Sequence, residues 1–218
     1  MGLAASFLCG YLFDGFGILK MSRWISFVIG LFLVSVAAGP VRASVPEDLV
    51  KTMASNVTAQ VRALPANATG VTPQVQAIIE RDIMPRFDFN RITQIAMGRN
   101  WLKASPAEQK QITTEFTHLL VRTYSNAINS LRDLDVVVKG SRSNGSDGDV
   151  TVRTQMVGRS QPTAIDYFLS NASGGWKVYD VQVEGVSLVS AYRDEFTSLV
   201  SSNGVAGVID ALKKKNAK

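Results

Sequence analysis

The feature that most constrains this chain is a change in the spacing of its apolar residues near position 135. Before that point, apolar residues recur every three or four positions, as on one side of an amphipathic helix. From Asp135 to Val183 they follow the period of two that half-buried strands show. Helices followed by strands are typical of an α+β domain, in which the helices cover one face of an antiparallel sheet.

Four segments of the second part fit strands, and connections rich in Gly, Asn and Ser separate them. Connections this short can join only antiparallel neighbours. The sequence therefore predicts one domain with a four-stranded antiparallel meander. Its strands are Asp135 to Lys139, Asp149 to Val157, Thr163 to Ser170 and Trp176 to Val183.

Capping residues predict where the helices of the first part begin. Ser105-Pro106-Ala107-Glu108 is the clearest start, because it combines a capping box with proline at the first helical position. The apolar stripe of this helix leaves His118 on the opposite side, so His118 is expected to face water. Three shorter helices are expected earlier, from Leu49 to Leu64, from Thr72-Pro73 to Pro85, and from Asp88 to Gly98.

Ser187 follows the last expected strand and precedes another helical pattern, which is the position of a hydrolase nucleophile. The hydrolase turn G-x-S-x-G needs a second glycine, but this chain has Val189 there. Such a serine also uses a downstream histidine, whereas His118 lies upstream. We therefore interpret Ser187 as a helix cap, with that helix broken at Asn203-Gly204.

Residues 1–43 are predicted to lie outside the domain, which would comprise residues 44–218. A cationic start at Met21, an apolar run and Val41-Arg42-Ala43 fit a signal peptide that is cleaved before Ser44. The residues before Met21 fit an upstream extension. An uncleaved membrane anchor is the alternative, although the apolar run is shorter than the about 20 residues that a span requires.

Charge and composition exclude several classes of function. Removal of residues 1–43 would leave 20 of the 23 basic and 17 of the 18 acidic residues, so nucleic-acid binding is disfavoured. The only cysteine, Cys9, would also be removed. With one histidine and no cysteine, the domain offers few metal ligands, and we expect no cofactor. A domain exported without disulfides favours a bacterial periplasm.

Two blocks of sequence resemble a known family. The first contains RDIMPRFDF from Arg81, MGRNW from Met97, SPAEQ from Ser105 and LVRTY from Leu120. The second is GWKVYDVQVEGVSL from Gly175, followed by Tyr192-Arg193 and Phe196. In order and spacing they are similar to the MlaC family, also called toluene-tolerance auxiliary proteins, which are periplasmic phospholipid carriers. The resemblance spans about residues 75 to 212.

The resemblance implies a curved sheet, similar to that of nuclear transport factor 2, that encloses an apolar cavity for acyl chains. It implies a carrier and not an enzyme. Its partners would be phospholipid, an outer-membrane lipoprotein complex and an inner-membrane ABC transporter with a substrate-binding ring, in a system that maintains outer-membrane lipid asymmetry. The lipid-binding residues that it implies are Leu120, Tyr124, Ile128, Val152, Tyr167, Tyr179 and Val186.

Three other functions remain open from the sequence. The cargo could be a rigid hopanoid-type lipid, since relatives of the family occur in hopanoid pathways. An envelope hydrolase could use Asp166, Asp180 or Glu184 as acid and base, although strand carboxylates are usually solvated or paired with cations. A pure interaction module would contain no cavity at all.

Overall fold

The computed structural model describes residues 45–65, 72–145, 148–158, 161–172 and 174–217. These belong to the second of two compact units, which runs from Arg42 to Lys218. The predicted signal peptide, its cleavage site and the start at Met21 lie outside the described residues. Within those residues, no helix has both the length and the apolar composition that a membrane span needs.

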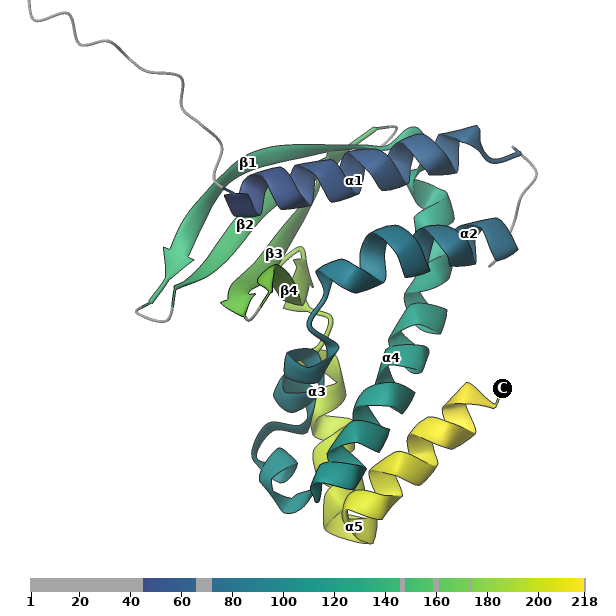
Figure 1. Ribbon diagram of the computed structural model, residues 1–218, viewed down its shortest axis with the longest axis vertical. Coiled ribbons are helices and arrows are strands. Elements are labelled where there is room, and N and C mark those ends of the chain that lie inside the picture. Colours follow the sequence, from purple (N-terminus) through teal and green to yellow (C-terminus); the bar gives the residue numbers. More distant parts are fainter. Residues whose placement is uncertain (1–44, 66–71, 146–147, 159–160, 173, 218) are drawn as a thin grey trace, which may run out of the picture. The chain divides into compact units, whose positions relative to one another are not determined.

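A curved antiparallel sheet forms one side of the unit (Figure 1). Its strand order follows the chain, β1-β2-β3-β4-β5, so the predicted meander is confirmed. The order also explains why short turns suffice to connect the strands. The strands are β1 (Asp135–Asn144), β2 (Asp149–Val157), β3 (Thr163–Ala172), β4 (Gly175–Val183) and β5 (Val186–Ser187).

The fifth strand corrects the predicted number of four. Glu184 and Gly185 have φ values of 50° and 80°, and two central residues with positive φ make the tight turn of a two-residue hairpin. The chain therefore turns back, and Val186 pairs with Val183 and Ser187 with Gln182. The expectation that a helix begins at Ser187 was wrong for this reason.

Two irregularities in strand pairing accompany the curvature of the sheet. In the β1–β2 pair the register shifts between Val138 and Gly140, and β1 continues to Asn144, beyond the predicted end at Lys139. In the β3–β4 pair it shifts between Phe168 and Leu169. Because an extra residue bends its strand and increases the local twist, both shifts favour a curved sheet over a flat one.

Helix α1 (Val45–Ala63) lies along the sheet, as Figure 1 shows. Val50 on this helix is fully buried and packs against Val152, Leu169 and Val178 of three successive strands. The helical stripe predicted from Leu49 to Leu64 therefore covers the sheet at its start. Nearer its end, Val57 and Val61 pack with Ile78 in a second cluster.

The predicted capping residues begin the next helices. Thr72 Oγ1 accepts a hydrogen bond from Val75 N, Asp88 Oδ1 accepts one from Arg91 N, and Ser105 forms the predicted capping box with Glu108. Each such bond satisfies an N–H group that has no partner within its helix. The elements are α2 (Pro73–Ile78), the π-helical turn η1 (Ile79–Ile83), η2 (Met84–Arg86), α3 (Phe89–Met97), η3 (Gly98–Lys103), α4 (Pro106–Asn129) and η4 (Ser130–Asp133).

The largest core cluster lies among α3, α4 and α5 (Arg193–Asn216), where Phe116 contacts Tyr192 and Phe196 edge to face. Helix α5 follows η5 (Ser190–Tyr192) and runs beside α4 (Figure 1). The predicted interruption at Gly204 is confirmed as a kink within α5, where φ is 66° and ψ is −170°. His118 is exposed on α4, as predicted.

Candidate functional site

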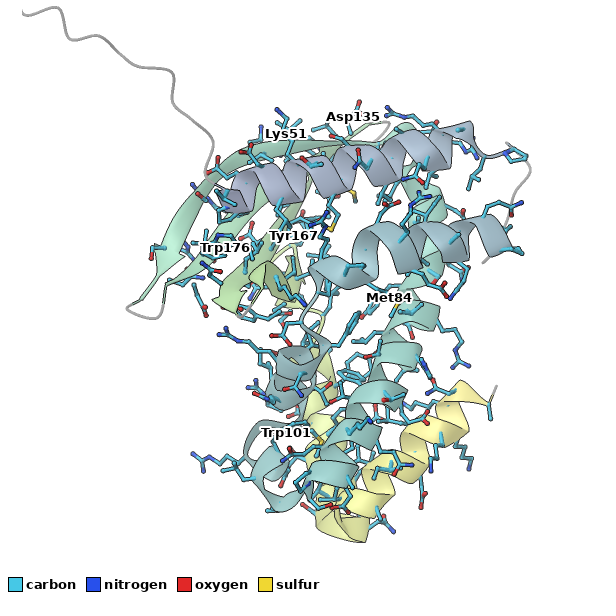
Figure 2. The ribbon with its side chains drawn as sticks, viewed as in Figure 1. Lys51, Met84, Trp101, Asp135, Tyr167 and Trp176 are labelled. Carbon is cyan, nitrogen blue, oxygen red and sulfur yellow. The ribbon has the colours of Figure 1, made fainter. Side chains whose placement is uncertain are left out.

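A cavity of about 480 Å³ lies between the sheet and the helices. Binding sites for small organic ligands usually have volumes of about 300–1,000 Å³. Figure 2 shows Tyr167 below α1 on the side of the sheet, and Met84 beside α4; both line the cavity. Its wall combines residues of α1, η1, η2, α3, α4, η4 and the strands.

The sheet contributes one face of side chains to this wall. Tyr167 on β3 lies opposite Val181 on β4, and Ile165 lies opposite Val183. Residues directly opposite each other in an antiparallel pair point to the same face, so all four side chains point into the cavity. Val136 and Met156, paired between β1 and β2, extend that face.

Helices α1 and α4 contribute the facing walls. On α1 the lining residues recur at the spacing of one helical face, and on α4 the same spacing continues almost to the end of the helix. The π-helical turn η1 adds two isoleucines between these helices. The helical lining residues include Met53, Ala54, Val57, Ile79, Ile83, Leu120, Val121, Tyr124, Ser125 and Ile128.

Two polar side chains in the wall, Asp180 and Ser125, are bonded to the protein itself. Asp180 is the only charged residue among the described lining residues, and its carboxylate accepts hydrogen bonds from Ser187 Oγ (2.7 Å) and from Val181 N (2.8 Å). Ser125 Oγ donates to the carbonyl of Val121 one turn earlier. Because most of the other lining residues are apolar, the wall suits hydrocarbon.

The two tyrosines of the wall are in apolar surroundings. Burial raises the pKa of the Tyr167 phenol to about 12, because the ionised form loses its hydration there. Burial also raises the pKa of Tyr124 to about 12, with a smaller contribution from the neighbouring Tyr192. Both side chains therefore present neutral rings to the cavity at neutral pH.

Ser187 has a structural role next to the wall. Its hydroxyl donates to Asp180 and also accepts from Ser190 N (2.9 Å), so it closes the turn that precedes η5. The sequence correctly predicted that the Ser187 hydroxyl accepts a hydrogen bond from a backbone N–H as a cap does. The prediction that it caps an α-helix was wrong, since the α-helix begins only at Arg193. Both interactions use the hydroxyl to hold the backbone beside β4.

A polar bridge joins α1 to η1 outside the cavity. Gln60 Nε2 donates to Asp82 Oδ2 (2.7 Å), and Asp82 also pairs with Arg81 (2.8 Å). Hydrogen bonding to Arg81, and then to Gln60, lowers the pKa of Asp82 below its usual value. The carboxylate is therefore ionised at neutral pH and holds together two elements whose other sides line the cavity.

Four of the seven residues that the family resemblance implied lie in the cavity wall: Leu120, Tyr124, Ile128 and Tyr167. The other three lie elsewhere. Val152 is fully buried beneath Val50 of α1. Val186 is 65% exposed at the hairpin turn.

Tyr179 lies on the other face of the sheet. Its ring packs against Phe168, the neighbour of Tyr167 in β3, with 6.2 Å between the ring centroids. The Arg91 guanidinium stacks on it at 3.8 Å and forms a bidentate ion pair with Asp149, at 2.6 and 3.2 Å. Burial, then hydrogen bonding to Asp149, raises the pKa of Tyr179 to about 12. This cluster joins α3 to the sheet.

The structure does not combine the three candidate carboxylates into an acid–base pair. Glu184 is exposed in the β4–β5 turn and accepts from Ala164 N, whereas Asp180 is bonded to Ser187 in the cavity wall. Asp166 neighbours Tyr167 along β3 and so points to the opposite face. Across the described part of the chain, no three His, Cys, Asp or Glu side chains come together as metal ligands do.

Comparisons with known proteins agree on one family. The family model of MlaC protein matches residues 51–214. The chain is 18% identical to the intermembrane phospholipid transport system binding protein MlaC of Haemophilus influenzae, over 90% of this chain and 94% of that protein. It is 25% identical to the toluene tolerance protein ttg2D of Pseudomonas putida, over 79% of this chain and 82% of that one.

A solved structure adds a ligand to this comparison. The phospholipid-binding protein of Ralstonia solanacearum, in complex with a phospholipid, superimposes with a TM-score of 0.71 and is 37% identical. The match covers 78% of this chain and 96% of the Ralstonia protein. Identity at this level extends the likeness from the fold to the sequence of the matched part of the chain.

Proposed function

Since this chain belongs to the MlaC family, we propose that it binds the acyl chains of a phospholipid in its cavity and carries the lipid through the periplasm. The apolar wall of the 480 Å³ cavity is the observation on which this proposal rests. The phospholipid bound by the Ralstonia relative supports the same ligand class. In this proposal Leu120, Tyr124, Ile128 and Tyr167 contact the acyl chains.

The size of the hydrophobic effect explains why such a carrier needs a cavity. Moving two acyl chains of about 14 methylenes each from water into apolar surroundings is favourable by on the order of 20 kcal/mol, at about 0.8 kcal/mol per methylene. An unprotected lipid therefore stays in its bilayer. A wall of Val, Ile, Leu, Met and aromatic side chains replaces the bilayer during transfer.

The same transfer free energy limits what the carrier can do alone. A bilayer solvates acyl chains about as well as the cavity does, so the net free energy of extraction is small. Direction must then come from partners that bind the loaded and empty carrier differently. We propose that these are an outer-membrane lipoprotein complex and an inner-membrane ABC transporter with a substrate-binding ring, acting to maintain outer-membrane lipid asymmetry.

Export and the absence of catalysis complete the proposal. Residues 1–43 serve as an extension and signal peptide that direct the carrier domain to the periplasm. The domain performs no reaction, because transfer of an intact lipid requires binding and release only.

Organic extraction of the purified protein, followed by mass spectrometry, tests this function. We expect one phospholipid per protein molecule. A protein that contains no lipid, and that takes up none from vesicles, would refute the proposal. Recovery of a triterpenoid in place of phospholipid would assign the cavity to hopanoid-type cargo.

A further inference from the structure

A second hollow, of about 560 Å³, adjoins the cavity between α2 and α4. Met84, Val121 and Ser125 line both, so the two spaces meet along α4. The remaining residues of the second hollow are all polar: Gln76, Glu80, His118 and Arg122. We call these four residues, with the three shared ones, the polar groove.

The polar groove differs chemically from the cavity that it adjoins. An amphiphile that places hydrocarbon in an apolar cavity has to place its polar end where water or polar side chains can solvate it. Glu80, His118 and Arg122 are exposed, so they remain hydrated and available. The groove therefore offers the change from apolar to polar surroundings that one phospholipid molecule requires.

Charge in the polar groove is divided between its two sides. Arg122 and His118, one turn apart on α4, provide N–H donors, and Glu80 on η1 provides a carboxylate. Guanidinium groups bind phosphate through paired N–H donors, and a carboxylate binds an ammonium group. The division matches a head group that contains a phosphate and an amine.

Existing bonds leave both charged side chains free to bind. The Arg122 guanidinium donates to the carbonyls of Lys215 and Asn216 at the end of α5, with 3.2 Å to Asn216 O, but it has five N–H groups. Glu80 accepts from Gln76 Nε2 through Oε1 (2.7 Å), and its Oε2 can accept from a ligand. Both groups are thus held in place and can accept a further partner.

We propose that the polar groove is the head-group site, in which Arg122 and His118 bind the lipid phosphate and Glu80 selects a head group with an amine. This inference rests on the proposed function, because it needs acyl chains in the adjoining cavity. It predicts a preference for a zwitterionic over an anionic phospholipid. Glu80 would repel an anionic head group that has no amine to neutralise the carboxylate.

Competition between two lipids tests the selection. Delipidated protein is incubated with vesicles of equal phosphatidylethanolamine and phosphatidylglycerol, re-isolated and extracted. We expect the wild type to be enriched in phosphatidylethanolamine. Glu80→Gln should lower the ratio of the two bound lipids by about two- to fivefold, the range for exposed charge pairs, and Glu80→Lys should lower it further. Asp210→Gln and Asp210→Lys, at an exposed site on α5 outside both hollows, should not change it.

The single histidine allows a direct test of head-group position. In untagged protein, NMR signals of the His118 imidazole should shift when phosphatidylethanolamine is loaded, because the phosphate would lie next to the ring. Two results together would refute the head-group site. The His118 signals would be unchanged in loaded protein, and neither Glu80→Lys nor Asp210→Lys would alter the ratio of the two bound lipids. Failure of every variant and of the wild type to load either lipid would instead refute the carrier function.

Discussion

A charge introduced at Ile128 should empty the cavity and leave the fold intact. Ile128 lies on α4 in the cavity wall; it is partly buried and packs against the cluster of Val57, Val61 and Ile78. In Ile128→Glu, the loaded state loses the contact of an apolar side chain with the acyl chain, about 1.5–3 kcal/mol. It must also accommodate a carboxyl group among hydrocarbon, at a further 1–3 kcal/mol even when the group is neutral.

The sum, about 2.5–6 kcal/mol, corresponds to a loss of about sixtyfold or more in lipid affinity. Because the carrier competes with bilayers of similar solvating power, such a loss should reduce its lipid content to nearly zero. The assay is lipid per protein by mass spectrometry after purification, with circular dichroism and thermal unfolding to confirm folding.

Three control variants separate the effect of the cavity from that of the substitution. Ile128→Met keeps an apolar side chain of similar size and should retain the lipid. Thr123→Glu adds the same charge at an exposed site of α4 outside the cavity, and Val186→Glu adds it at the exposed hairpin turn. Both should load normally. Normal loading of a folded Ile128→Glu protein would refute the placement of acyl chains along α4.

Three further predictions concern stability. Arg91→Ala leaves the carboxylate of Asp149, whose side chain is only 11% exposed, without its ion partner, and should lower the free energy of unfolding by about 3 kcal/mol in denaturant titration. Gly158→Ala places a Cβ 2.4 Å from Leu134 Cδ2 and 2.6 Å from the Asp133 backbone oxygen, and should lower the free energy of unfolding by about 1–3 kcal/mol. The pKa of Tyr167, about 12 when folded against 10.0 when unfolded, predicts constant stability from this group below pH 10 and a loss of about 1.4 kcal/mol per pH unit from there to pH 12. Tyr167→Phe should remove that loss in alkaline unfolding experiments; an unchanged slope would contradict it.

Local patterns in the sequence were sufficient to predict most elements of this fold. The capping box at Ser105 and the caps at Thr72 and Asp88 depend on hydrogen bonds within four residues, so their outcome does not depend on the rest of the chain. The same holds for the kink at Gly204. The hairpin turn at Glu184-Gly185 was equally local, but a helical pattern after it concealed the two-residue strand.

The candidate site was less predictable, because it depends on contacts between distant segments. Val152 lies opposite Tyr167 and points to the same face, yet Val50 of α1 covers it and the cavity lies farther along the strands. Periodicity identifies the face of a strand and not what covers each part of it. For Tyr179, alternation from Val181 predicts the cavity face, but the register shift at Phe168/Leu169 leaves Tyr179 outside the pairing and directs it to the opposite face.

The division of the core explains how one domain can contain so large a cavity. Deleting buried atoms costs about 24 cal/mol per Å³ of enclosed empty space, so 480 Å³ would correspond to about 12 kcal/mol if the whole cavity were closed and dry. That is comparable to the whole stability of a typical domain. The main cluster around Phe116 and Phe196 lies among α3, α4 and α5, whereas Val50 and Val57 belong to separate, smaller clusters beside the sheet and α2. The helical cluster contributes Ile92 and Val189 to the cavity wall, but its centre at Phe116 and Phe196 lies outside that wall. This centre can therefore stay packed when the cavity is empty, and bound hydrocarbon adds contacts between the sheet and the helices.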